Sequence, residues 1–229
     1  MSPPATRPGA LVDQTALWLP LLRSLTESSV ERAVWKNIEA GLTGEGDVDF
    51  IAPVGEWDAI EHEFLRWARV HEVGPVVVCR HAPGALFLIA LGGRDEPWLQ
   101  LDVRAHATLR GATVFRVEDA LPLIEFDGRG FRRLQAGAEG IFKLVTSGLA
   151  PGGRPNPRGL RKERVAELLR DDPQAAAAAT HTFGIARAAL QAGAGAVAAG
   201  GWDRGAMARV EAYVMLRGMR TPHTAVGQS

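Results

Sequence analysis

Two aspartates separated by a single residue stand where a glycine-rich segment passes into an apolar run. Residues 41–53 read GLTGEGDVDFIAP, and the two carboxylates are those of Asp47 and Asp49. In a strand the side chains alternate between faces, so this pair would share a face with Ile51. Neighbouring carboxylates repel each other and are poor strand formers, so folding alone gives little reason to place them there. A divalent cation would remove the repulsion, whereas the simpler interpretation is an acidic surface turn.

A third carboxylate, that of Asp102, lies in a segment whose alternation predicts a strand. From Leu99 to Val103 every second residue is apolar and would face a core. The intervening polar side chains would face outward together: Gln100, Asp102 and Arg104. The sequence therefore predicts a carboxylate in mid-strand on a polar face.

The first half of the chain alternates between predicted helices and strands. Helical spacing is present over residues 13–25, where Pro20 predicts a kink or a boundary, and over residues 56–72. Further strands are predicted at the end of residues 29–36 and at residues 76–80, 86–91 and 98–104, with a polar turn at residues 92–97. In the aspartate stretch the side chains expected to enter the core are Val48, Phe50 and Ala52. This pattern predicts a mixed sheet of about five strands with helices on one side.

The second half of the chain predicts helices and no strand. Helices are expected at residues 117–124, 136–149, 160–170, 174–198 (split near Gly193) and 203–218, with a loop at residues 147–159. The predicted organisation is a disordered N-terminus at residues 1–12, an α/β domain at 13–116, a helical domain at 117–220 and a loose tail at 221–229. The fold class expected is therefore α+β.

The composition is that of an ordinary soluble globular protein. Among 229 residues, 26 basic side chains balance 26 acidic ones, so no net charge steers the chain toward nucleic acid or membrane. Cys79 is the single cysteine, which excludes an intramolecular disulfide and a cysteine-based zinc site and favours a cytoplasmic setting. The apolar run Ala16–Leu22 is short, contains a proline and lacks a basic lead-in, so neither a signal peptide nor a membrane span is expected. The high alanine, glycine and arginine usage is typical of a GC-rich bacterial genome.

Three familiar catalytic motifs are excluded by their missing residues. His62-Glu63 lacks the second histidine of a metalloprotease helix, because Arg66 occupies that position. The glycine-rich turn lacks the Gly-Lys-Ser/Thr ending of a P-loop, and no Gly-x-Ser-x-Gly elbow is present. The carboxylates therefore remain the main chemical signal.

The order of these features resembles the nucleotidyltransferase superfamily typified by DNA polymerase β. A glycine-rich turn, an Asp-x-Asp pair opening a strand, a helix and a later mid-strand aspartate occur over residues 34–104, and the helical second half is also similar to that family. The resemblance implies a palm-like module followed by a helical domain. It also implies Mg²⁺-dependent transfer of a nucleotidyl group from an NTP to a hydroxyl group, with two Mg²⁺ ions.

By this resemblance, individual residues receive roles. Asp47 and Asp49 would hold both metal ions, and Asp102 would complete the site of the catalytic metal. Gly44 and Gly46 would let backbone amides approach the phosphates. The metal ligands implied are thus Asp47, Asp49 and Asp102.

The sequence departs from the family pattern upstream of the first aspartate. Family members usually carry a Gly-Ser pair there that contacts the triphosphate, whereas this chain has Trp35-Lys36-Asn37. Lys36 would replace the phosphate contact with a point charge, and Asn37 would supply an amide. Lys143, early in the helical half, would reach a phosphate across the cleft, although a solvated helix lysine is the other interpretation.

Several functional interpretations remain open. The acceptor hydroxyl could belong to a small molecule, an RNA or a protein. A second interpretation is a catalytically inactive relative that binds a nucleotide or a protein chain, as a regulatory or antitoxin-like subunit does. A third is a structural α/β domain whose aspartates are surface residues. The oligomeric state is not indicated by the sequence.

Overall fold

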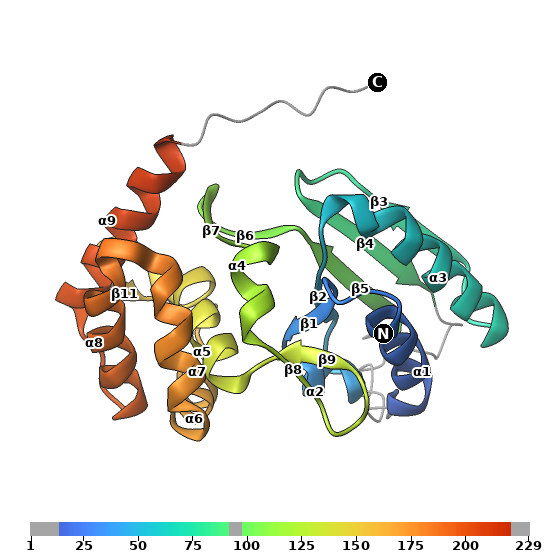
Figure 1. Ribbon diagram of the computed structural model, residues 1–229, viewed down its shortest axis with the longest axis horizontal. Helices are drawn as coiled ribbons and strands as arrows, with labels where there is room; N and C mark the ends of the chain where they lie inside the picture. The colour runs from blue at the N-terminus through green and yellow to red at the C-terminus, as the bar shows by residue number, and fades with distance from the viewer. Residues whose placement is uncertain (1–13, 92–97, 221–229) are drawn as a thin grey trace, which may run out of the picture. The chain divides into compact units, whose positions relative to one another are not determined.

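The chain folds into two compact units. The computed structural model describes residues 14–91 and 98–220, which are drawn as ribbons in Figure 1. The first unit runs to Ala105 and includes the returning segment Phe126–Arg132, and the remaining residues form the second unit. The sequence predicts a single boundary at residues 116–117, whereas the units change at residues 105–106, 125–126 and 132–133. The predicted N-terminal segment, the 92–97 turn and the 221–229 tail lie outside the described residues.

The first unit is built on a mixed β-sheet. The strand order is β3-β4-β5-β2-β1-β9-β8. Strands β2 and β5 are parallel neighbours, whereas β1–β2, β3–β4 and β4–β5 are antiparallel. The strands are β1 (Ala33–Lys36), β2 (Val48–Ile51), β3 (Val76–Cys79), β4 (Ala85–Ala90), β5 (Leu99–Arg104), β8 (Ile124–Phe126) and β9 (Arg132–Leu134). The predicted mixed sheet and the α+β class are confirmed, but this sheet has two more strands than the five expected.

The additional strands come from the part of the chain for which no strand was predicted. Each of β8 and β9 has three residues, which is too short for an alternating pattern to be recognised in the sequence. The prediction that the chain beyond residue 117 lacks strands was therefore wrong. The two strands follow β1 in the sheet order, and the segment that joins them, Phe126–Arg132, belongs to the first unit.

The helices of the first unit cover one face of the sheet. They are α1 (Thr15–Glu27), α2 (Ile38–Leu42) and α3 (Trp57–Val70), with a 3₁₀ turn η1 (Val54–Glu56) before α3. Their apolar side chains join one core with inward residues of the strands, including Val48, Phe50 and Ala52 as predicted. Trp18 of α1 stacks on Trp67 of α3 with ring centroids 5.7 Å apart, and Figure 1 shows these two helices side by side. The opposite face of the sheet carries the polar row that forms the candidate site.

The second unit is mainly helical. Its helices are α4 (Val117–Ala120), η2 (Leu121–Leu123), α5 (Ala136–Thr146), α6 (Lys162–Asp171), α7 (Pro173–Ala179), η3 (Thr180–Ala186), α8 (Arg187–Ala198) and α9 (Arg204–Arg220). Two hairpins accompany them: β6 (His106–Leu109) with β7 (Ala112–Arg116), and β10 (Leu149–Ala150) with β11 (Arg154–Pro155). The predicted helical character of this half is confirmed, and the hairpins are an addition to it.

The long helical stretch after residue 173 breaks at a different glycine from the one predicted. Gly184 has φ 48° and ψ −122°, a conformation outside the helical region, and it breaks the helical stretch within η3, between α7 and α8. Gly193 instead lies inside α8 and is buried, and a Cβ there would come within 2.4 Å of Met207 Sδ on α9. Gly193 therefore allows α8 and α9 to pack closely. In the sequence, a glycine with this role looks the same as one that breaks a helix.

No helix among the described residues is long and apolar enough to cross a membrane.

Candidate metal centre

The carboxylates of Asp47, Asp49 and Asp102 come together at the centre of the sheet. One oxygen from each lies within 4.8 Å of the others. Asp49 on β2 is the direct neighbour of Asp102 on the parallel strand β5, and Asp47 immediately precedes β2. The structure thus brings the predicted triad together from segments more than fifty residues apart in the sequence.

Both in-register carboxylates are buried. Asp49 is 2% exposed and Asp102 is 4% exposed, whereas Asp47 is partly exposed. The expectation that Asp102 faces outward was therefore wrong, although its predicted grouping with Gln100 and Arg104 on one face is correct. Its side chain is held by these neighbours. A buried carboxylate needs such partners because desolvation penalises its charge.

Strand pairing places these carboxylates within a row that runs across five strands. The residues in register are Lys36 on β1, Asp49 on β2, Asp102 on β5, Phe87 on β4 and Cys79 on β3. Paired residues of neighbouring strands project to the same face of a sheet. The row therefore has a cation at one end, two carboxylates in the middle and an aromatic ring beyond them.

Lys36 reaches Asp49 because strand β1 contains a bulge. Val34 pairs with Phe50, but the next pairing joins Lys36 to Asp49, so the register shifts by one residue at Trp35. A bulge inserts one residue and redirects the side chains that follow it. Here it turns the Lys36 ammonium to 3.1 Å from Asp49 Oδ1. Without the shift, the apolar Trp35 would occupy that place in the row.

Asn37 adds a second donor to the same carboxylate. Its backbone is left-handed, with φ 57° and ψ 24°, a conformation that asparagine tolerates better than most residues. Its Nδ2 donates to Asp49 Oδ2 over 3.4 Å. Lys36 and Asn37 therefore both contact the central carboxylate.

Asp102 is held by partners on its own strand. Gln100 Nε2 donates to Asp102 Oδ1 over 2.7 Å, and Arg104 Nη2 lies 3.6 Å from Asp102 Oδ2. The Arg104 guanidinium also lies over the ring of Phe87, 5.4 Å from its centroid. Gln100 was not predicted as a site residue; its two-residue spacing from Asp102 was the signal available in the sequence.

The burial of the carboxylates changes their proton affinity. Burial raises the pKa of Asp49 from 3.8 to about 6; the Lys36 ammonium opposes the rise, and the charges of Asp47 and Asp102 add to it. Burial also raises the pKa of Asp102, against the hydrogen bond from Gln100 and with the nearby Asp47 charge. Burial therefore disfavours the charged form of both carboxylates.

The glycine-rich turn before β2 has one glycine whose role is steric. A Cβ on Gly41 would come within 2.6 Å of Val48 Cγ2 and 3.2 Å of the Asp47 carbonyl oxygen, so only glycine lets α2 approach the start of β2. Gly44 has φ 76°, which favours glycine, whereas a Cβ on Gly46 would meet only Ala40 Cβ at 4.0 Å. The phosphate contacts implied for Gly44 and Gly46 stay predictions.

Lys143 belongs to the second unit. It is buried in α5, and its Nζ lies 3.3 Å from Glu139 Oε1 one helical turn away. The solvated position considered for it is therefore wrong, and its contact with a phosphate stays a prediction.

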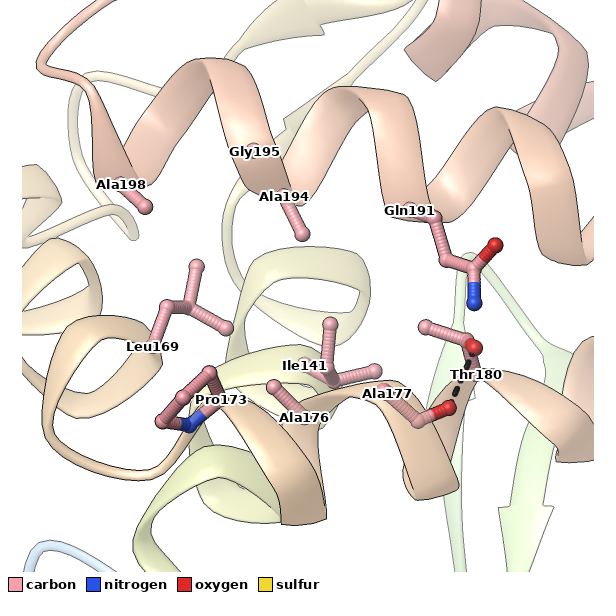
Figure 2. Close-up of a pocket in the computed structure, with 10 residues that line it drawn as sticks. All are labelled: Ile141, Leu169, Pro173, Ala176, Ala177, Thr180, Gln191, Ala194, Gly195 and Ala198. Carbon is pink, nitrogen blue, oxygen red and sulfur yellow. Dashed lines mark hydrogen bonds between the residues drawn. The ribbon is translucent and has the colours of Figure 1, made fainter.

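The second unit also contains a pocket of about 280 Å³ between its helices (Figure 2). The lining residues are Ile141, Leu169, Pro173, Ala176, Ala177, Thr180, Gln191, Ala194, Gly195 and Ala198. Thr180 Oγ1 donates to the carbonyl oxygen of Ala177 over 2.6 Å, and Gln191 lies at the same end of the pocket. None of these described lining residues is charged, so the pocket lacks the groups that bind a metal ion or a phosphate.

Comparison with known proteins supplies no relative, since no family model, curated protein or solved structure matches the chain. The function is therefore argued from the geometry of the carboxylates and their partners.

Proposed function

We propose that the protein is a Mg²⁺-dependent nucleotidyltransferase that joins a nucleotidyl group from an NTP to a hydroxyl group of an acceptor. The observation that carries the proposal is the convergence of three carboxylates to within 4.8 Å, two of them buried and directly paired on β2 and β5. Burying paired carboxylates raises their pKa and is unfavourable for folding. A bound cation would offset this cost, which supports a metal-binding role for the arrangement.

The donor set fits Mg²⁺. This ion prefers hard oxygen ligands and is usually bound through a few carboxylates, with phosphate oxygens and water in the remaining positions. In two-metal sites the ions lie about 3.5–4 Å apart, a separation that three converging carboxylates can bridge. Asp47, Asp49 and Asp102 would hold the ions, which, when bound, activate the attacking hydroxyl and stabilise the leaving pyrophosphate.

The protein's own residues would position the substrates around this centre. Lys36 offers a positive charge beside Asp49 for the triphosphate, and the Asn37 carboxamide offers a hydrogen-bond donor next to it. On the other side of the row, Phe87 and Arg104 flank Asp102, where the acceptor hydroxyl would approach. A palm-like identity of the first unit is part of this proposal, and the parallel β2–β5 pair that carries the triad supports it.

The experiment is a pyrophosphate-release assay with each NTP, Mg²⁺ and a panel of acceptors from the three open classes: small hydroxylated molecules, RNA 3′ ends and proteins. The proposal expects Mg²⁺-dependent release that the substitutions Asp49→Asn and Asp102→Asn abolish, while Asp58→Asn, at an exposed carboxylate of α3, leaves it unchanged. Loss of a metal ligand removes a contribution of several kcal/mol to the transition state. Mg²⁺-dependent NTP binding without release in any acceptor class would instead support the inactive, regulatory interpretation. If the parent and both aspartate variants bind NTP equally, the metal centre is rejected.

A further inference from the structure

Lys36 already provides the central carboxylate with a positive charge. Its Nζ lies 3.1 Å from Asp49 Oδ1, and it is the bulge at Trp35 that places it there. A bulge leaves one residue of the strand without a regular partner in the hydrogen-bonded ladder. The backbone of β1 therefore fixes where the Lys36 side chain begins. Any divalent cation that binds Asp49 must therefore compete with an ammonium group that the fold itself supplies.

The two members of this ion pair differ in their freedom to move. The Asp49 side chain is 3% exposed and sits in mid-strand, whereas the Lys36 side chain is 20% exposed. The Lys36 Nζ also lies 4.6 Å from the centroid of the Trp35 ring. The lysine side chain is a flexible four-carbon stem, so its ammonium can change partners. When a second cation arrives, the lysine is thus the partner that can move away.

We propose that Lys36 is a built-in counter-ion that a divalent cation displaces from Asp49, and that the displaced ammonium then binds a polyphosphate. This inference rests on the proposed function and concerns how the same site is loaded. A divalent cation and the Lys36 ammonium repel each other when both lie against one carboxylate, so metal and lysine do not share Asp49 without loss. A polyphosphate relieves that loss because it offers the lysine a new anionic partner.

The consequence is coupled loading of the site. The cation alone binds weakly because it must dislodge Lys36, and the polyphosphate alone binds weakly because Lys36 is engaged and the carboxylates repel it. Together they bind well, and by linkage each raises the affinity of the other by the same factor. The lysine would in this way keep the site from holding a bare metal ion when no nucleotide is present.

The test uses Lys36→Met, which removes the charge and keeps most of the stem. Lys36→Arg retains the charge, and Lys162→Met makes the same charge change at a partly exposed lysine of α6 as a matched control. Two titrations are made by calorimetry: Mg²⁺ alone, and inorganic tripolyphosphate in excess Mg²⁺. Loss of Lys36 removes an influence that lowers the pKa of Asp49. The titrations are therefore run at about pH 8.5, so that Asp49 is ionised in the variant as well as in the parent.

The inference expects opposite changes in the two titrations. Lys36→Met should bind Mg²⁺ alone about tenfold more tightly than the parent and bind tripolyphosphate about tenfold more weakly, while Lys36→Arg and Lys162→Met stay close to the parent. A general loss of structure would weaken both ligands, so weakening of both, or no change in either, overturns the inference. If the parent binds Mg²⁺ and Lys36→Met binds both ligands as the parent does, the inference fails and the proposed function stands. If neither the parent nor Lys36→Met binds Mg²⁺ more tightly than Asp49→Asn does, the proposed function fails with it.

Discussion

Asp49 and Asp102 are direct neighbours on the parallel strands β2 and β5, and both carboxylates are almost completely buried. Each has one cation beside it, Lys36 on the neighbouring strand β1 for Asp49 and Arg104 on the same strand for Asp102. The repulsion between the two acids is therefore reduced but not removed, and burial raises both of their pKa values. This relationship, together with the proposed metal centre, makes several measurable predictions.

The stability of the protein should carry a signature of Asp49 in its pH dependence. Its pKa is about 6 in the folded protein against 3.8 as the usual value, so the folded state binds the proton more tightly. The contribution to stability is present below about pH 4 and is lost as the pH rises through about 6, with an upper limit of about 3 kcal/mol. Asp49→Asn removes this titration. Urea unfolding measured at about pH 4 and about pH 8 should therefore show that the free energy of unfolding of Asp49→Asn, relative to that of the parent, is higher at about pH 8. The same difference between variant and parent at both pH values would contradict the assigned pKa.

Mg²⁺ should stabilise the parent protein and not the aspartate variants. A ligand that binds only the folded state at a hundred times its Kd adds about 2.7 kcal/mol to the free energy of unfolding. We expect a shift of that order for the parent and for the exposed control Asp58→Asn, and none for Asp49→Asn or Asp102→Asn. Denaturant unfolding with and without the ion measures it. An equal stabilisation of all four proteins would place the ion elsewhere.

A buried arginine should be a major support of the first unit. Arg32 is 3% exposed, and its guanidinium donates to Glu56 Oε2 from Nε over 2.8 Å and to Ser28 Oγ from Nη1 over 2.7 Å. Arg32→Met leaves Glu56 without this partner and should cost about 3–5 kcal/mol. In the control Arg164→Met, an exposed ion pair with Glu167 is lost and the cost should stay under about 0.5 kcal/mol. Equal costs at the two sites would show that burial does not decide the strength of these pairs.

Two helix glycines of the second unit should respond in opposite directions to alanine. A Cβ on Gly195 of α8 meets nothing within 4 Å, so Gly195→Ala should stabilise by about 0.5–1 kcal/mol through helix propensity. A Cβ on Gly137 of α5 would come within 1.9 Å of the Asp172 carbonyl oxygen, which is backbone, so Gly137→Ala should destabilise by about 3 kcal/mol. Thermal unfolding of the two variants compares them directly, and a stabilised Gly137→Ala would refute the close packing of α5 on the start of α7.

The triad was predictable because its signals are local. The one-residue separation of Asp47 and Asp49 and the alternation around Asp102 each identify a strand face from neighbouring residues alone. What joins them is the parallel register of β2 and β5. The register depends on how strands far apart in the chain pair, and no local pattern encodes it.

The partners of the triad were harder to predict for the same reason. Lys36 faces Asp49 only because the bulge at Trp35 shifts the register, and a bulge leaves no trace in hydrophobic alternation over four residues. The break at Gly184 was missed because a glycine that ends a helix and one that packs a helix look alike in sequence. Such features are set by contacts between elements.

The most direct test of the central claim is a crystal of the protein soaked with Mn²⁺ and a non-hydrolysable NTP analogue, with anomalous scattering recorded to locate the metal. We expect anomalous peaks about 2 Å from carboxylate oxygens of Asp47, Asp49 and Asp102, with two ions about 3.5–4 Å apart and the triphosphate bound to them. A bound nucleotide or metal elsewhere, with no peak within bonding distance of these carboxylates, would contradict the account.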